Sequence, residues 1–227
     1  MKALILGGGG REHALAWKLK RDDPSLELLA APGNPGIAEL ARCVAVSPTD
    51  IARVVDLAAS ERVDVVVVGP EAPLAAGVVD ALRANRIAAF GPTAAAARIE
   101  TSKRFAKDLM ARAGVPTAGA SHHTDIDSAR RAAETLGAPV VIKATGLAAG
   151  KGVVVCESIA QAHATIDRML RERTLGDAGA EILVEEFMEG EELSVFAPNS
   201  GTAGPLQPGT EVHAYWHPAH SFVLERA

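Results

Sequence analysis

The chain is poor in aromatic residues and in cysteine. Aromatic side chains make up 4% of its 227 residues and hydrophobic residues 48%, so aliphatic side chains and alanine must form the core. Such a composition favours helices packed on a sheet over a sandwich of strands. The two cysteines, Cys43 and Cys156, lie far apart in apolar, strand-like segments. We expect both to be buried free thiols of a reducing compartment rather than a disulfide.

Long apolar runs and blocks of basic residues are also missing. Uninterrupted apolar stretches, such as residues 65–68, are far shorter than the roughly 20 residues that span a bilayer. No cleavage signature precedes the first glycine loop. Acidic and basic residues are interspersed in a net charge of -5, which argues against a nucleic-acid-binding surface. The sequence therefore predicts a cytoplasmic protein that binds small molecules, and neither a membrane nor a nucleic acid.

Strand and helix patterns alternate through the first hundred residues. Apolar runs predict strands, and the segments between them carry helical periodicity. The strands are expected at residues 2–6, 26–30, 63–68 and 88–90, and helical segments at residues 12–20, 37–41, 51–60 and 76–85. This rhythm predicts a parallel sheet with right-handed crossovers, whose ligands gather outside the carboxyl ends of the strands. Three loops fall at that edge, at residues 7–10, 32–36 and 69–71.

A second unit begins near residue 102. One helical pattern runs from residue 94 through Lys103 to Gly114, with Pro116 beyond it as a stop signal. The following segments predict an α+β unit, with helices at residues 128–136 and 159–173 and strands at 139–144, 153–156 and 181–186. From residue 197 to residue 227 the composition changes and predicts an irregular tail. His213 and His217 lie in this tail beside Pro218, and we expect no metal site there.

The glycine-rich segment after Lys143 is the most informative in the chain. Its glycines let backbone N–H groups turn toward an anion, and Lys143 and Lys151 are spaced to bracket a polyphosphate. Three residues separate Gly146 from Gly150, and Gly152 follows Lys151, so the segment is not a P-loop. The β-branched run that follows predicts a strand. The segment therefore predicts a hinged flap over nucleotide phosphates, the alternative being a glycine-rich hairpin with incidental lysines.

Two further segments suggest ligand contacts. Residues 185–192 form an acidic linker after an expected strand, and such a linker can offer backbone groups to adenine and a carboxylate to ribose. Taken alone, it is equally a solvated acidic turn.

The glycine loop at residues 7–10 lacks the third glycine of a dinucleotide fingerprint, because Glu12 occupies that place. Its helix start favours a monophosphate, with a tight structural turn as the alternative.

Asn34 and Glu71 follow two of the expected strands. Either side chain can bind a pair of sugar hydroxyls or an amine. For Glu71 the alternative is a simple cap on the following helix. No arrangement of the catalytic-triad type appears, so we expect no catalytic side chain in the strict sense.

In these segments the chain resembles the phosphoribosylamine–glycine ligase family of the ATP-grasp superfamily. The resemblance is carried, in family order, by residues 9–17, 31–34, 68–74, 90–93, 102–103, 143–153 and 185–192. Thr145 departs slightly, since the family usually has an acidic or small polar residue there. The resemblance implies an α/β fold: an N-terminal Rossmann-like (pre-ATP-grasp) parallel sheet over residues 1–101, then a partial α+β ATP-grasp domain over 102–196.

The resemblance also implies an activity, ligands and roles for single residues. The activity is ATP-dependent joining of glycine to 5-phosphoribosylamine through a glycyl phosphate, with ATP and Mg2+ as cofactors. The implied ATP-binding residues are Lys103, Lys143, Gly146, Gly150, Lys151, Gly152, Glu185, Met188 and Glu192. The implied phosphoribosylamine-binding residues are Gly9, Gly10, Asn34 and Glu71.

The resemblance ends after residue 196. The family continues with an Asp-His-Lys segment, a Gly-Gly-Met-Gly loop, and a Glu and an Asn that hold magnesium, and none of these appears in residues 198–227. We therefore expect a truncated or frame-shifted chain whose activity in isolation is in doubt. The alternative is a noncatalytic nucleotide- or phosphosugar-binding module, or a subunit completed by a second chain. We expect a monomer, or self-association through surface exposed by the truncation.

Overall fold

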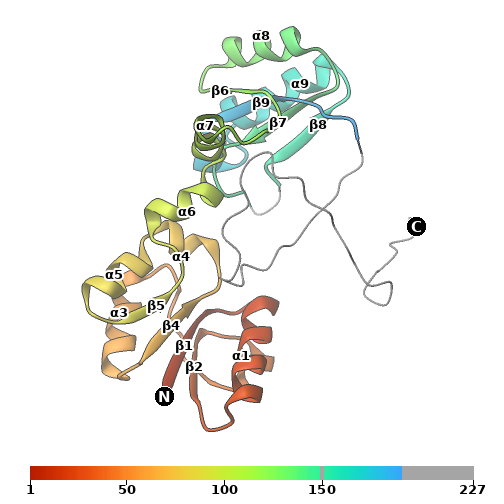
Figure 1. Cartoon of the computed structure of the whole chain (residues 1–227). Helices are drawn as coiled ribbons and strands as arrows, with labels where there is room; N and C mark the ends of the chain where they lie inside the picture. Colours follow the sequence, from red (N-terminus) through yellow and green to blue (C-terminus); the bar gives the residue numbers. More distant parts are fainter. Residues whose placement is uncertain (149–150, 191–227) are drawn as a thin grey trace, which may run out of the picture.

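The computed structural model describes residues 1–148 and 151–190, and these form two sheets with helices packed on them (Figure 1). The first sheet is parallel, in the order β3-β2-β1-β4-β5, which confirms the predicted parallel sheet. Its strands are β1 (Lys2–Gly7), β2 (Glu27–Pro32), β3 (Arg42–Cys43), β4 (Val65–Val68) and β5 (Ala88–Phe90).

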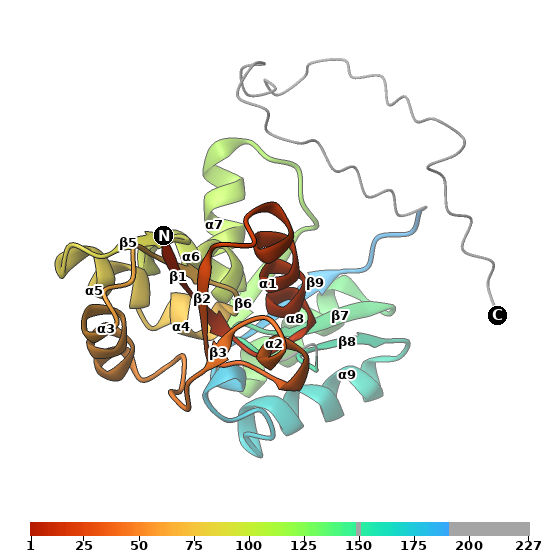
Figure 2. The ribbon, with the colours of Figure 1, turned by 90° about the horizontal axis from the view of Figure 1, so that it is seen from below.

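Helices cover both faces of the first sheet because its strands are apolar on both sides. In β1, Leu4 and Leu6 belong to one buried cluster and Ala3 and Ile5 to another, as the alternation of side chains along a strand requires. Figures 1 and 2 show α3 and α5 on one side of the sheet and α1 on the other. The helices are α1 (Gly10–Asp22), α2 (Pro35–Ala38), α3 (Ile51–Ser60), α4 (Glu71–Ala75) and α5 (Val78–Ala84).

The second sheet is antiparallel, in the order β6-β9-β7-β8, and the predicted β7–β8 hairpin is confirmed. Ile142 and Val184 point into a buried cluster with residues of α8 and α9, whereas their neighbours Lys143 and Glu185 face the other side. The elements are α6 (Ala94–Thr101), α7 (Lys103–Ala113), β6 (Ala120–His123), α8 (Ile126–Leu136), β7 (Val140–Ala144), β8 (Val153–Cys156), α9 (Ile159–Ile166), a π-helical turn η1 (Asp167–Arg171), a 3-10 turn η2 (Gly176–Gly179) and β9 (Ile182–Glu186).

Three details differ from the prediction. The helix expected over residues 94–114 is two helices, because Ser102 adopts an extended backbone (φ -134°, ψ 104°) that ends α6 and begins α7. The helix expected over residues 76–85 is present as α5, which begins only at Val78 because Gly77 before it lies at φ 86°; α4 is a separate short helix ahead of it. Cys43 is exposed rather than buried, because β3 is a two-residue strand at the sheet edge; Cys156 is buried, and both thiols are free.

Two further predictions concern the end of one helix and the lack of membrane-spanning segments. The helix expected over residues 159–173 is regular only to Ile166 and continues as the π-helical turn η1. Among the described residues, no helix is both long and apolar enough to cross a membrane. The expected tail at residues 197–227 lies outside the described residues.

Candidate nucleotide-binding cleft

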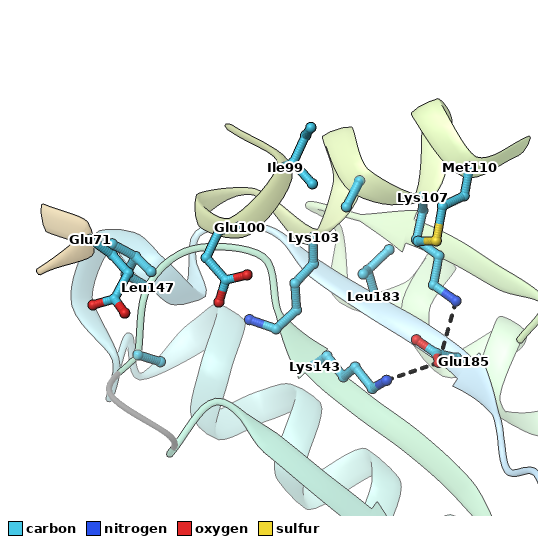
Figure 3. A pocket seen from close by; sticks show the side chains of 12 residues that line it. Glu71, Ile99, Glu100, Lys103, Lys107, Met110, Lys143, Leu147, Leu183 and Glu185 are labelled. Atoms are coloured by element: carbon cyan, nitrogen blue, oxygen red, sulfur yellow. Dashed lines mark hydrogen bonds and ion pairs between the residues drawn. The ribbon is translucent and has the colours of Figure 1, made fainter. Parts of the chain in front are cut away.

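A cleft of about 480 Å³ lies where the second sheet meets α6 and α7 (Figure 3). Side chains from α7, β7 and β9 line its inner wall, and Glu71, the first residue of α4, lies at its other end. The lining residues that carry a charge are Glu71, Glu100, Lys103, Lys107, Lys143 and Glu185. Four of the predicted site residues, Glu71 of the first unit and Lys103, Lys143 and Glu185 of the second, therefore meet at one cleft.

Lys143 reaches the cleft because of its place in β7. Its neighbours Ile142 and Ala144 are fully buried in the core of the second unit, so the alternation of the strand turns Lys143 to the opposite face. There its ammonium Nζ donates to Glu185 Oε1 at 2.8 Å. Glu185 lies on the adjacent strand β9, and the antiparallel pairing of β7 with β9 brings the two side chains together.

Glu185 is a buried carboxylate between two ammonium groups. Only 5% of the residue is exposed, and its Oε1 lies 2.8 Å from Lys143 Nζ and 3.3 Å from Lys107 Nζ. Its other oxygen, Oε2, is buried without a hydrogen-bond partner among the described residues. The carboxylate therefore neutralises part of the positive charge of the cleft.

Lys107 was not identified from the sequence. Its ammonium donates to Thr117 Oγ1 and to the carbonyl of Ala118, each at 2.7 Å, in addition to its ion pair with Glu185. A signal was present, because Lys107 follows Lys103 by four residues and such residues share one helix face. That signal does not show that the face meets Glu185, because the contact comes from the packing of α7 beside β9.

Lys103 supplies the third ammonium group of the cleft. Its Nζ lies 3.4 Å from the carbonyl oxygen of Gly146, at the start of the glycine loop. Burial lowers the pKa of Lys103 below its ordinary value, and the nearby charge of Lys143 lowers this pKa further. A ligand with phosphate oxygens would relieve both effects by placing negative charge between the two lysines.

The glycine loop is shaped partly by close packing. A Cβ at Gly146 would lie 2.8 Å from Ala178 Cα, and one at Gly152 would lie 2.8 Å from Ala148 Cβ. The absent side chains of these two glycines therefore let the ends of the hairpin approach their neighbours. Lys151 is exposed, and Gly150 lies outside the described residues.

The loop at residues 7–10 holds a buried carboxylate of its own chain. Glu12 is 4% exposed, and its Oε2 accepts the backbone N–H of Gly9 at 2.7 Å. The N–H of Gly9 is therefore engaged within the protein. The N–H groups of the first turn of α1, beginning with Gly10, have no acceptor within the helix, as at any helix start.

Asn34 and Glu71 connect the loops at the carboxyl edge of the first sheet. Asn34 donates to the carbonyl of Gly8 at 2.9 Å and caps α2 by accepting the N–H of Ile37 at 2.9 Å. Glu71 Oε1 accepts from Arg11 Nη2 at 2.8 Å, and this guanidinium lowers the pKa of the Glu71 carboxyl. The contact links the first turns of α1 and α4, so Glu71 belongs both to this edge and to the cleft.

The remaining predicted residues lie after β9 or beyond the described part. Met188 follows β9 and is 67% exposed, while Glu192 lies outside the described residues. Within residues 1–148 and 151–190, no three His, Cys, Asp or Glu side chains gather into a group that could hold a metal ion.

Comparison with known proteins identifies the class to which this cleft belongs. Residues 101–211 match the family model "Phosphoribosylglycinamide synthetase, ATP-grasp (A) domain", so the cleft lies in an ATP-grasp domain. Residues 1–100 match "Phosphoribosylglycinamide synthetase, N domain". The chain therefore belongs to the phosphoribosylglycinamide synthetase family, as its sequence resemblance predicted.

Single relatives agree with the family models. Phosphoribosylamine–glycine ligase of Mesorhizobium japonicum is 52% identical over 202 residues, which are 89% of this chain and 47% of the relative. The crystal structure of phosphoribosylamine–glycine ligase from Thermotoga maritima, at 25% identity, has a TM-score of 0.69 and covers 84% of this chain and 45% of its own.

A more distant structure shares the fold alone. Carboxyaminoimidazole ribonucleotide synthase from Aspergillus clavatus, crystallised in complex with ATP, is 21% identical, with a TM-score of 0.65 over 82% of this chain and 47% of its own. The chain spans about half the length of the curated relatives it matches.

Proposed function

We propose that this chain carries the phosphoribosylamine-binding and part of the ATP-binding structure of a ligase that joins glycine to 5-phosphoribosylamine. The product is glycinamide ribonucleotide, a step of purine biosynthesis, and glycyl phosphate is the intermediate. One observation carries the proposal: three ammonium groups, from α7 and β7, line a 480 Å³ cleft that reaches from the second sheet to Glu71 of the first unit. We further propose a cytoplasmic, monomeric protein, with residues 1–101 binding phosphoribosylamine and residues 102–196 binding the nucleotide.

The charges of the cleft suit phosphoryl transfer. Such a reaction needs positioning and electrostatic stabilisation more than a proton-transfer side chain. In the proposed site Lys103 and Lys143 bind the phosphates of ATP, and the loop from Gly146 to Gly152, with Gly150 and Lys151, covers them. The two lysines come from different elements, α7 and β7, so their ammonium groups approach the phosphates from two directions.

The adenosine part of ATP is assigned to the end of β9. Glu185 and Met188 hold adenine through backbone groups, and Glu192 holds ribose. Met188 is 67% exposed and follows β9, whose residue Glu185 lines the cleft. This assignment leaves the side chain of Glu185 free for its contacts with the two lysines.

The acceptor substrate is assigned to the carboxyl edge of the first sheet. The first turn of α1, at Gly9 and Gly10, favours a phosphate through its unpaired N–H groups and the helix dipole. Asn34 and Glu71 flank this turn and offer polar atoms to a ribose or to its amine. Since Glu71 also lines the cleft, an amine held there would lie toward the nucleotide.

A second function is a noncatalytic module or a subunit completed by another chain. The ammonium groups of the cleft are sufficient to hold phosphates whether or not a reaction follows. In this case the cleft would bind ATP without turning it over.

Binding and turnover distinguish these two functions. Calorimetry with ATP should show binding by the wild-type chain, and Lys143→Ala should weaken it by about tenfold or more, since a charged partner of a phosphate is lost. Lys18→Ala, on the outer surface of α1, serves as the control and should bind like wild type. Unchanged affinity in Lys143→Ala would remove the proposed site. Release of ADP with glycine and phosphoribosylamine would then favour the ligase, and binding without release the noncatalytic module.

A further inference from the structure

Glu185 presents an electrostatic problem for a nucleotide site. In the protein without nucleotide its Oε1 holds Lys143 at 2.8 Å. If phosphates draw Lys143 away, the carboxylate loses a partner while 5% exposed, and an unpaired buried charge is strongly unfavourable. Binding of ATP would then be opposed by the very group that holds Lys143.

Lys107 is placed to solve this problem. Its ammonium lies 3.3 Å from the same oxygen, Glu185 Oε1 (Figure 3). It also donates to Thr117 Oγ1 and to the carbonyl of Ala118, both at 2.7 Å, and its side chain is only 16% exposed. These contacts hold Lys107 to the segment before β6, so it stays beside Glu185 when Lys143 moves.

We propose that Lys107 is a positioning residue of the nucleotide site, a fixed counter-ion of Glu185 that leaves Lys143 available to the phosphates. The inference rests on the proposed ATP binding by this cleft. Lys107 touches no phosphate in this arrangement, and its effect passes through Glu185 to Lys143. Without the ammonium group of Lys107, Lys143 is the one cation within reach of Glu185 among the described residues. Glu185 then holds Lys143 more tightly.

Lys107→Met tests this inference, with methionine keeping an unbranched chain of similar length. ATP affinity should fall by about tenfold, because part of the buried pair must now be broken to bind phosphate. Affinity for adenosine should change less than about twofold, because adenosine has no phosphate to draw Lys143 away from Glu185. A merely structural role predicts an equal loss for both ligands, and that result would overturn the inference.

A double-mutant cycle isolates the pair. In a Glu185→Gln background no buried carboxylate needs a counter-ion, so Lys107→Met should then change ATP affinity by less than about twofold. The same loss in both backgrounds would overturn the inference. Lys18→Met is the matched control, since Lys18 pairs with Asp22 on the surface of α1, and it should bind ATP like wild type.

The outcome is separable from that of the proposed function. If Lys143→Ala weakens ATP binding and Lys107→Met leaves it unchanged, the inference is wrong and the proposed function stands. If the wild-type chain does not bind ATP, both the inference and the proposed function are wrong.

Discussion

Gly69 shows how a single absent side chain shapes the site. A Cβ at this position would lie 2.1 Å from Oε1 of Glu12 and 2.6 Å from its Cδ, so the buried carboxylate occupies the space of the missing side chain. Gly7 and Gly9 border the same carboxylate, whose Oε2 also accepts the N–H of Gly9. The glycines of these loops thus leave room for the buried carboxylate of Glu12 as well as for any ligand.

Gly69→Ala should destabilise the protein by about 1–3 kcal/mol, the usual cost of overpacking, because the added Cβ must displace the buried side chain of Glu12, whose Oε2 accepts the N–H of Gly9. Gly10→Ala is the matched control, since a Cβ there meets nothing within 4 Å. It should be neutral or stabilising by up to about 1 kcal/mol. Urea denaturation measures both changes. Equal stability of the two variants would contradict the crowding around Glu12.

Lys103 should make nucleotide affinity sensitive to pH. Burial and the charge of Lys143 lower the pKa of Lys103 from 10.5. Phosphate favours the charged ammonium, so as the pH rises through this lowered pKa the free protein loses the proton that binding requires. ATP affinity should therefore fall as the pH rises in this range. Calorimetry at increasing pH checks the fall, and Lys103→Met should make it smaller; an identical fall in the variant would exclude Lys103 as its cause.

The junction of α6 and α7 is the element on which the position of Lys103 depends. Ser102 accepts the N–H of Phe105 through its hydroxyl at 3.2 Å and donates its own N–H to the carbonyl of Arg98 at 3.0 Å. The extended backbone of this one residue separates the two helices. Lys103 follows directly, and its backbone N–H donates to the carbonyl of Thr145 beside the glycine loop at 3.1 Å.

Ser102→Ala should cost about 1 kcal/mol, the usual loss on removing a helix N-cap, and should also weaken ATP binding because the turn that places Lys103 loosens. Ser158→Ala is a matched control. Ser158 caps α9 by accepting the N–H of Gln161, also at 3.2 Å, on the far side of the second sheet from the cleft. Thermal denaturation should show similar losses in both variants, and calorimetry a weaker affinity only in Ser102→Ala. Equal affinities would contradict a role of the junction in the site.

Elements with strong local signals were predicted correctly, and elements set by single residues were not. The strands around Leu4, Val66 and Ile142 follow from apolar runs bounded by turn residues. The break at Ser102 was missed because the helical pattern continues through it, and serine is both a tolerated helix residue and a preferred cap. β6 was missed as well, because its sequence Ala-Ser-His-His has no apolar alternation and its pairing with β9 alone makes it a strand.

At the scale of the whole molecule, the two units have separate cores. The buried clusters of the first sheet contain only residues up to Leu82, and the cluster of the second sheet begins at Ala129. Between them, α6 packs on α4 and on α7. The cleft lies along this connection, so it is formed between two units that have separate buried cores.

Ile142→Ala should therefore unfold the second unit selectively. Ile142 is fully buried, and such a truncation costs about 2–5 kcal/mol. Hydrogen exchange should speed up in β7 and β9 and stay unchanged in β1 and β4. Ile5→Ala, equally buried in the first unit, is the reciprocal control and should give the opposite pattern. Loss of protection in both sheets in either variant would show one cooperative unit instead of two.

The sequence by itself determined most of the strands and helices, the parallel first sheet, the hairpin after Lys143 and the family, because these depend on local periodicity and on short motifs. Only the tertiary structure decided which charges meet. Lys143 and Glu185 lie 42 residues apart in the chain, and Glu71 joins them in one cleft from α4 of the first unit. The register of β7 on β9 places Lys143 beside that carboxylate, and α7 brings Lys107 to the same oxygen. Such contacts arise from packing between distant segments, about which the spacing of residues along the chain holds no information.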